Sequence, residues 1–226
     1  MMTQTTAGGI LPPESHRMPR LSRPSPLPRL ALVLAAALAL APLAPAAQAA
    51  PLPPVTVDGQ VFAGNARVAE ADLLLNGTGM RAAFIYKVYA AGLYLPRRLS
   101  TPAAIYGEPG PKRLQLRMLM NGPSDEFAKA FNKGLAKSLT PEQIAAMKDR
   151  IDAFDRTLRE IGDLHKGDVI DLDFLPARGL ALTLNGKPRG TPVPGADLYT
   201  ALLAIFLGDR PVDKALKTGL LGGPVS

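Results

Sequence analysis

The chain lacks several residue types on which protein chemistry often depends. Its 226 residues contain no cysteine and no tryptophan, and histidine occurs only at His16 and His165. These absences exclude disulfide scaffolds, thiolate metal sites, cysteine nucleophiles and histidine-rich metal clusters. Hydrophobic residues make up 47% of the chain and charged residues 20%, which is the balance of a chain that folds around a core.

The first 49 residues have the pattern of an export signal. Arginines precede an uncharged run of 14 residues, Leu30 to Leu43, and Ala47-Gln48-Ala49 then supplies the small-x-small pattern that signal peptidases accept. We expect cleavage before Ala50 and a periplasmic protein with no stable membrane span. A retained anchor is the alternative, although a span needs roughly 20 residues. Met18 makes a more typical signal start than Met1, so residues 1–17 are a candidate misassigned extension.

Without this leader the net charge is small. The formal charge of the chain is +7, but the leader carries four arginines and one glutamate, which leaves about +4 on residues 50–226. Basic and acidic residues are interspersed there, and no basic run exceeds a pair such as Arg97-Arg98. We therefore expect solvated surface charge and no nucleic-acid partner. The length is that of one ordinary domain.

The first part of this domain is predicted to be rich in strands. Asp58-Gly59, flanked by valines, indicates a hairpin. Leu73 to Leu75 is predicted as a short strand that stops at Asn76-Gly77-Thr78-Gly79. Residues 82–95 are rich in aromatic and aliphatic side chains but too long for one flat strand, so we expect a strand that bends near residues 90–92.

Helices and further strands are expected after this segment. Periodicity and end signals predict a strand at 112–120, helices at 124–135 and 140–161, strands at 169–175 and 180–184, a hairpin turn at Asn185-Gly186, and helices at 198–207 and 212–221. Alternation along its strand places Asp171 and Asp173 on the solvent face. This order predicts an α+β domain in which helices cover one face of a mainly antiparallel sheet.

Several motifs resemble those of chalcone isomerase-like proteins. The segment LNGTGMR, Leu75 to Arg81, followed by KVYAAGLYL, Lys87 to Leu95, resembles the first signature of that family, a G-x-G-x-R turn and a K-x-[T/Y]-x-x-G-x-Y-L strand. Landmarks of its exported bacterial branch are matched, in order, by Lys166-Gly-Asp168, Leu184-Asn-Gly-Lys187, Pro194-Gly-Ala-Asp197, Phe206-Leu-Gly208 and Lys217-x-Gly-Leu-Leu-Gly222. The resemblance implies an open-faced sandwich with an apolar cleft between sheet and helices.

The resemblance also implies two possible uses of the cleft. True isomerases close a chalcone into a flavanone, and the arginine of G-x-G-x-R is thought to stabilise the developing enolate. Other members hold a fatty acid, whose carboxylate is bound by the same arginine and a nearby tyrosine. Arg81 matches that arginine, and Tyr89 stands where the isomerases have threonine and the fatty-acid binders have tyrosine. The resemblance therefore favours the binders.

Three further residues are weaker candidates for contact with a ligand. Lys87 would share a face with Arg81 and Tyr89 in a continuous strand. Asn132 is an imperfect stand-in for the polar residues that the isomerases carry on the first central helix. Tyr199 falls about where another isomerase contact residue lies.

Each candidate also has an ordinary structural explanation. Arg81 could pair with Asp72 or Glu70 on a neighbouring strand, the tyrosines could be core or strand aromatics, and Lys87 could lie extended along the sheet edge. We expect an exported binder of a fatty acid or a similar small amphipathic carboxylate. The alternatives are an isomerase with Arg81 as its electrophilic group, and an envelope interaction protein without a ligand. No metal or organic cofactor is implied.

Overall fold

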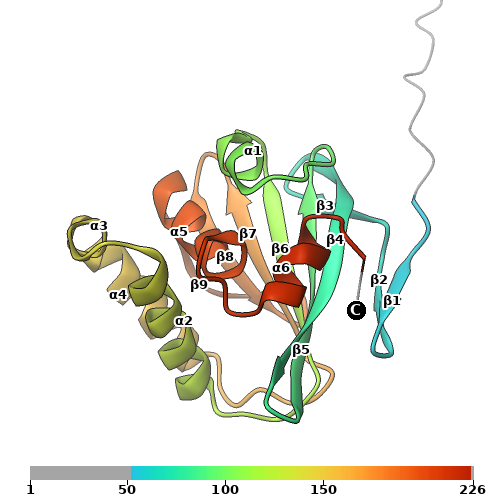
Figure 1. The fold of residues 1–226 in the computed structure, drawn as a ribbon. Coiled ribbons are helices and arrows are strands. Elements are labelled where there is room, and N and C mark those ends of the chain that lie inside the picture. Colours follow the sequence, from blue (N-terminus) through green and yellow to red (C-terminus); the bar gives the residue numbers. More distant parts are fainter. Residues whose placement is uncertain (1–51, 225–226) are drawn as a thin grey trace, which may run out of the picture. The chain divides into compact units, whose positions relative to one another are not determined.

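A seven-stranded antiparallel sheet organises residues 52–224, which are the residues described by this computed structural model (Figure 1). Its strands, in both sheet and chain order, are β3 (Asn65–Val68), β4 (Ala71–Ala83), β5 (Tyr86–Leu95), β6 (Lys112–Met118), β7 (Val169–Leu175), β8 (Gly179–Leu184) and β9 (Lys187–Val193). Each strand thus pairs with its sequence neighbours. The expected export signal, residues 1–49, and its cleavage position lie outside the described residues.

Helices cover one face of this sheet (Figure 1). They are α1 (Pro102–Gly107), α2 (Ser124–Ser138), α3 (Pro141–Ala146), α4 (Lys148–Glu160), α5 (Ala196–Leu207) and α6 (Lys214–Leu220). Helix α5 is buried on most of its sides, as its apolar sequence predicts. The predicted α+β class, with helices on one face, is confirmed. None of the helices in residues 52–224 is both long enough and apolar enough to cross a bilayer.

The predicted N-terminal hairpin is present and packs on the other face of the sheet. Strands β1 (Val55–Val57) and β2 (Gln60–Phe62) pair around the turn at Asp58-Gly59. The ring of Phe62 is fully buried in a small cluster with Leu73, Leu75 and Tyr94. This hairpin therefore gives the sheet a second, smaller apolar contact on the face opposite the helices.

The glycines after Leu75 do not end the strand, contrary to the sequence-based expectation. Strand β4 continues to Ala83, with a shift of register between Leu75 and Gly77. A Cβ at Gly77 would collide with the carbonyl oxygen of Gly219, so the lack of a side chain lets α6 lie against the strand. These glycines serve close packing rather than a turn.

The prediction of one bent strand at residues 82–95 is also wrong. The chain reverses direction between β4 and β5 through Phe84 and Ile85, and Phe84 has a positive φ of 55°. Arg81 and Tyr89 consequently lie on neighbouring antiparallel strands and are direct cross-strand partners. Such partners project from the same face of a sheet. The two residues share a face as expected, but through pairing rather than through spacing along one strand.

The long helix predicted at 140–161 is divided in two. Thr140 caps α3 with a reciprocal capping box, and Met147, at φ −112° and ψ 6°, separates α3 from α4. The expected apolar stripe continues across this break and buries Ile151, Phe154 and Leu158 in α4. The periodicity correctly predicted the buried face but did not predict the break in the helix at Met147.

Asp171 and Asp173 are buried, which contradicts their predicted exposure. Each has 7% of its surface exposed, on the face of the sheet opposite the helices. Arg113 donates to both carboxylate oxygens of Asp173 at 2.7 Å, and Gln115 donates to Asp171 at 2.7 Å. Alternation placed these carboxylates on the correct face, but that face carries a polar network rather than open solvent.

Candidate functional site

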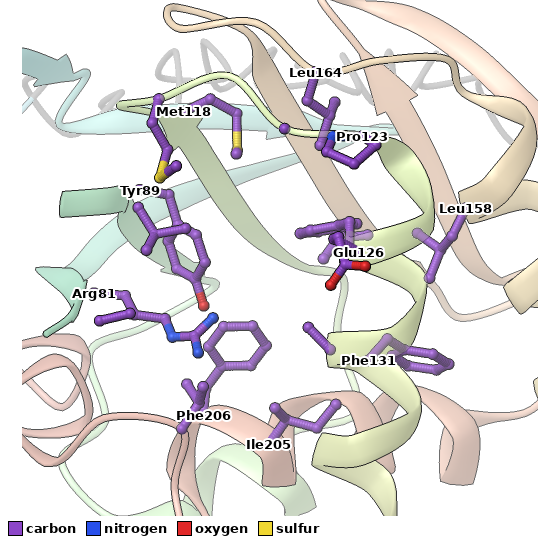
Figure 2. A pocket seen from close by; sticks show the side chains of 18 of the residues that line it. Arg81, Tyr89, Met118, Pro123, Glu126, Phe131, Leu158, Leu164, Ile205 and Phe206 are labelled. Atoms are coloured by element: carbon purple, nitrogen blue, oxygen red, sulfur yellow. The ribbon is translucent and has the colours of Figure 1, made fainter. Parts of the chain in front are cut away.

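A cavity of about 380 Å³ lies between the sheet and the helical layer (Figure 2). This volume is within the range of roughly 300–1,000 Å³ that is typical of small-molecule sites. Most of the lining is aliphatic, aromatic or thioether, and it includes Met118, Phe127, Phe131, Leu158, Ile205 and Phe206. An apolar cleft between sheet and helices is therefore present, as the resemblance implied.

Arg81 supplies the positive charge of this cavity. The residue is partly buried near the end of β4, and its Nε atom is buried without a hydrogen-bond partner in residues 52–224. No carboxylate of the described chain lies within 4.0 Å of its guanidinium. The alternative in which Arg81 pairs with Asp72 or Glu70 is wrong, because Arg67 binds both carboxylates, at 3.0 and 3.1 Å.

Tyr89 lies beside Arg81 and is 4% exposed. The guanidinium carbon of Arg81 is 5.8 Å from the centre of the tyrosine ring, and Figure 2 shows the hydroxyl directed toward the guanidinium. Burial raises the pKa of Tyr89 to about 12, although the charge of Arg81 acts in the opposite direction. The phenol is therefore protonated at neutral pH and can donate a hydrogen bond.

A second, smaller hollow of about 130 Å³ adjoins the cavity and shares Arg81 with it. Lys133 and Lys137, one turn apart on α2, line this hollow together with Arg210, and its described lining contains no carboxylate. These residues were not predicted from the sequence. The spacing of the two lysines was the available signal, but exposed lysines at that spacing are common on helices.

Comparison with known proteins agrees with this architecture. A family model described as chalcone isomerase-like matches residues 54–222. The chain belongs to the chalcone isomerase-like family. A solved structure with the same fold is that of a fatty-acid binding protein of Arabidopsis thaliana, with 16% identity and a TM-score of 0.54 over 74% of this chain and 95% of that chain. No curated protein matches the sequence significantly.

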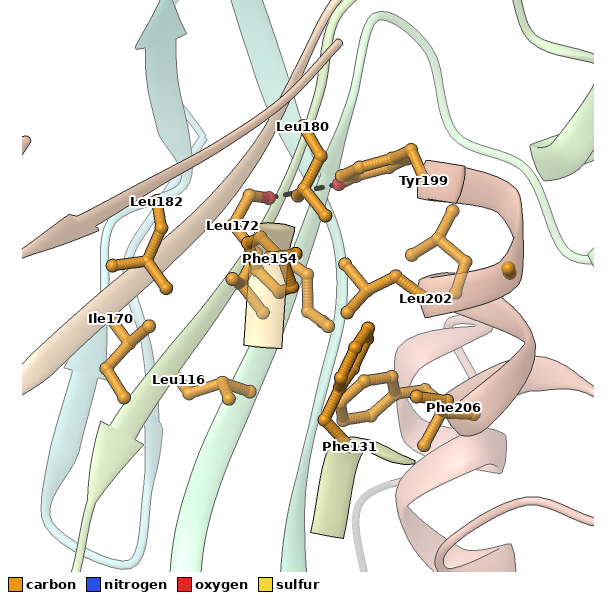
Figure 3. Close-up of a cluster of buried hydrophobic side chains, with 14 of the residues drawn as sticks. Leu116, Phe131, Phe154, Ile170, Leu172, Leu180, Leu182, Tyr199, Leu202 and Phe206 are labelled. Atoms are coloured by element: carbon orange, nitrogen blue, oxygen red, sulfur yellow. Dashed lines mark hydrogen bonds between the residues drawn. The ribbon is translucent and has the colours of Figure 1, made fainter. Parts of the chain in front are cut away.

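Three other residues proposed for the site do not line the cavity of this chalcone isomerase-like protein. The buried Tyr199 hydroxyl donates to the carbonyl oxygen of Leu172 at 3.1 Å (Figure 3). Lys87 is exposed and pairs with Asp58. The amide of Asn132 donates to Asp155 and, at 3.2 Å, to the carbonyl oxygen of Ala128. Of the five candidates, the structure brings only Arg81 and Tyr89 together in the cavity wall.

The chemistry that this cavity offers is narrow. Its described titratable lining consists of Arg81, Tyr89 and Glu126, and Glu126 is exposed at the rim, where Lys129 binds it at 2.7 Å. The Phe131 and Phe154 rings pack edge to face, 5.2 Å apart, in the apolar wall. Apart from the exposed Asn121 and Glu126, the polar side-chain groups of the described lining are the guanidinium of Arg81 and the hydroxyl of Tyr89. Two neighbouring donors in an apolar enclosure suit one anionic group on an apolar body.

Proposed function

We propose that this protein is an exported, non-catalytic binder of a fatty acid or a similar small amphipathic carboxylate. Arg81 and Tyr89 would bind the carboxylate, and the apolar cavity would enclose the chain. The observation that carries this proposal is the guanidinium of Arg81, which faces the cavity beside a protonated phenol and has no carboxylate partner among residues 52–224.

The polar end of the site favours an anion for simple electrostatic reasons. A guanidinium can donate two parallel hydrogen bonds to a carboxylate, and such charge-assisted bonds are roughly twice as strong as neutral ones. Exclusion of water by the surrounding aromatic and aliphatic groups strengthens them further. Lys133, Lys137 and Arg210 in the adjoining hollow add positive potential on the same side of Arg81.

The rest of the cavity favours an alkyl chain. Each methylene that leaves water for such a wall contributes about 0.8 kcal/mol. Met118 and Met120 are flexible thioethers that can adjust to chains of different shape. The Arabidopsis structure that shares the fold is described as a fatty-acid binding protein, which supports this choice of ligand.

An isomerase is the alternative activity in this family, and the residues of the cavity give it less support. Closure of a chalcone requires a phenolate. The site must therefore provide a group that accepts the proton of the phenol or one that stabilises the phenolate. The described lining contains no histidine, lysine or aspartate. Its one carboxylate, Glu126, is exposed at the rim and paired with Lys129, and Tyr89, with a pKa of about 12, is a poor base at neutral pH. Arg81 alone could stabilise an enolate, so the binder is the better supported function.

The proposal can be tested with the protein purified from the cells that make it. Native mass spectrometry is expected to find one acyl ligand per chain, and organic extraction would identify it. Delipidated protein should then bind palmitate at least about tenfold more tightly than hexadecanol, because only the acid carries the charge that Arg81 attracts. Equal affinity for acid and alcohol would refute the assigned polar end. No binding of either, with no chalcone turnover, would favour the interaction-protein alternative.

A further inference from the structure

The turn between β4 and β5 exposes three consecutive large apolar side chains. Phe84, Ile85 and Tyr86 have relative exposures of 103%, 87% and 62%. The other large hydrophobic residues that are exposed in residues 52–224 are Val55, Val61 and Met120, with exposures of 37%, 50% and 38%. The most exposed apolar side chains of the described chain are thus concentrated at one hairpin tip.

The conformation of the turn does not account for these residue types. Phe84 occupies the first position of a two-residue turn with a positive φ of 55°, where glycine, asparagine or aspartate is usual. A phenylalanine there is strained in its backbone and gains no contact from its ring. Neither local geometry nor packing in the described chain favours it, so its benefit is expected to come from something that binds the tip.

The tip is continuous with the lip of the cavity. Ala83 and Val88, on either side of the exposed residues, both line the cavity. The β6–α2 connection lies beside them, since the Leu119 amide donates to the carbonyl oxygen of Val88 at 3.0 Å, and Met120 from this connection is a further exposed lining residue. Figure 1 shows the β4–β5 hairpin and this connection at the same end of the molecule.

We propose that the Phe84–Tyr86 tip docks on the surface of a lipid bilayer and places the cavity mouth against it. This inference rests on the proposed function, because an amphipathic carboxylate could then pass between bilayer and cavity along a continuous apolar path. A narrow tip of three side chains is small beside the roughly 1,200 Å² of a stable protein–protein interface. Insertion of a few apolar and aromatic groups into a bilayer interface needs no such area.

Charges at the rim of the mouth favour an anionic bilayer as the partner, because the carboxylate of Glu126 is neutralised by Lys129 whereas Lys166 is not paired with a carboxylate in the described chain. Lys166 lies at this rim, because its amide donates to the side chain of the lining residue Asn121 at 2.8 Å. Its side chain is exposed and has no carboxylate within 4.0 Å in the described part of the chain. The ring and hydroxyl of Tyr86 suit the boundary between headgroups and acyl chains. The tip would therefore combine shallow apolar insertion with attraction to anionic headgroups.

Vesicle co-sedimentation tests this proposal directly. Protein isolated from its own cells is mixed with vesicles of equal parts phosphatidylcholine and phosphatidylglycerol. The double variant F84N/I85S is expected to lower the partition coefficient by at least about tenfold, because two large apolar side chains no longer leave water. Its thermal stability should not fall, because asparagine tolerates the positive φ at position 84 better than phenylalanine. A stable variant that partitions like the wild type would overturn the proposal.

A matched control is the variant Val55→Ser. Val55 is exposed on β1 and does not line the cavity, so its replacement is expected to leave partitioning unchanged. An equal loss in this variant would mean that general surface hydrophobicity, and not the tip, drives binding. If the tip variant changed only self-association, the occupant would be a second copy of the chain and the bilayer proposal would be wrong.

Palmitate titration in solution separates this inference from the proposed function. F84N/I85S is expected to bind palmitate with wild-type affinity, since neither residue lines the cavity. If the wild type binds palmitate but no vesicles, the docking proposal fails alone. If it binds vesicles through the tip but no palmitate, the tip is a membrane-docking element and the proposed ligand is wrong.

Discussion

Two arginines on opposite faces of the same sheet show how burial and partnership determine what a charge does. Arg113, on β6, donates to both carboxylate oxygens of Asp173 at 2.7 Å and lies 3.5 Å from Asp171. Arg81, on β4, faces the cavity, and residues 52–224 supply it with no carboxylate within 4.0 Å. A guanidinium that is satisfied within the fold stabilises that fold. One left unpaired at an apolar cavity is available for a ligand.

The same contrast separates two buried tyrosines. The hydroxyl of Tyr199 donates to the carbonyl oxygen of Leu172, within the core (Figure 3). The hydroxyl of Tyr89 is directed toward Arg81 at the cavity wall (Figure 2). Burial raises the pKa of both phenols, so both remain neutral at physiological pH. The sequence and the burial do not distinguish these residues, whereas the groups that their hydroxyls face do.

The largest expected effect is on stability, in the variant Arg113→Met. Removal of this guanidinium would leave Asp173 and Asp171 buried without their cation, and loss of one member of a buried pair typically costs about 3–5 kcal/mol. We expect the free energy of unfolding, measured by urea denaturation, to fall by about 3 kcal/mol. A loss below about 1 kcal/mol would mean that water screens the pair and that the contrast between the two arginines is overstated.

Arg81→Met is expected to show the reverse pattern. Its free energy of unfolding should be unchanged or higher, because the Arg81 Nε atom has no partner to lose in the described chain. Its affinity for palmitate should fall by roughly 10- to 100-fold, because this factor corresponds to the free energy of hydrogen bonds to a charged group. Calorimetric titration measures the affinity, and hexadecanol serves as the control ligand. A variant that lost stability as well as affinity would place Arg81 among the structural residues.

Much of the fold could be predicted from the sequence because periodicity reports burial. Alternation identified β6, β7 and β8, and the stripe from Ile144 to Ile161 identified the buried face of α4 and the partly buried Ile144 of α3. The errors arose where a non-local contact decided the outcome. A glycine such as Gly77 is typical of a turn. Here its lack of a side chain is explained by the packing of α6, which lies more than a hundred residues later in the chain. Phe84 does not resemble a turn residue at all.

The site was predictable only in part, and for a related reason. The family resemblance indicated Arg81 and Tyr89, and the structure places both in the cavity wall, while their role in binding stays a prediction. Side-chain partners, which no pattern reveals, decided the other positions: Asp58 pairs with Lys87, and Asp155 accepts from Asn132. The buried carboxylates Asp171 and Asp173 were missed because alternation gives the face of a strand but not what covers it.

Tyr89→Phe should have an intermediate effect on binding. Removal of one neutral donor costs about 0.5–1.5 kcal/mol, so the affinity for palmitate is expected to fall by roughly 3- to 10-fold. The wild-type affinity should also stay constant between about pH 7 and pH 10, because burial holds the pKa of Tyr89 near 12 and the hydroxyl remains a donor throughout. If the affinity declined within that range, and the decline were absent in Tyr89→Phe, the phenol would ionise at a lower pH than its burial indicates.

The smallest expected effect concerns the basic hollow beside Arg81. In the double variant K133Q/K137Q two exposed charges are lost, and the affinity for palmitate should fall by about two- to threefold at low ionic strength. The difference should disappear in roughly 1 M salt, where the Debye length is about 3 Å, whereas the loss in Arg81→Met should persist because that charge is partly buried. Lys148→Gln is a suitable control, because Lys148 lies outside both hollows and pairs with Asp152 at 2.5 Å. If K133Q/K137Q weakened binding as much at high salt as at low salt, the lysines would contact the ligand directly. The binding site would then extend from Arg81 to the two lysines of α2.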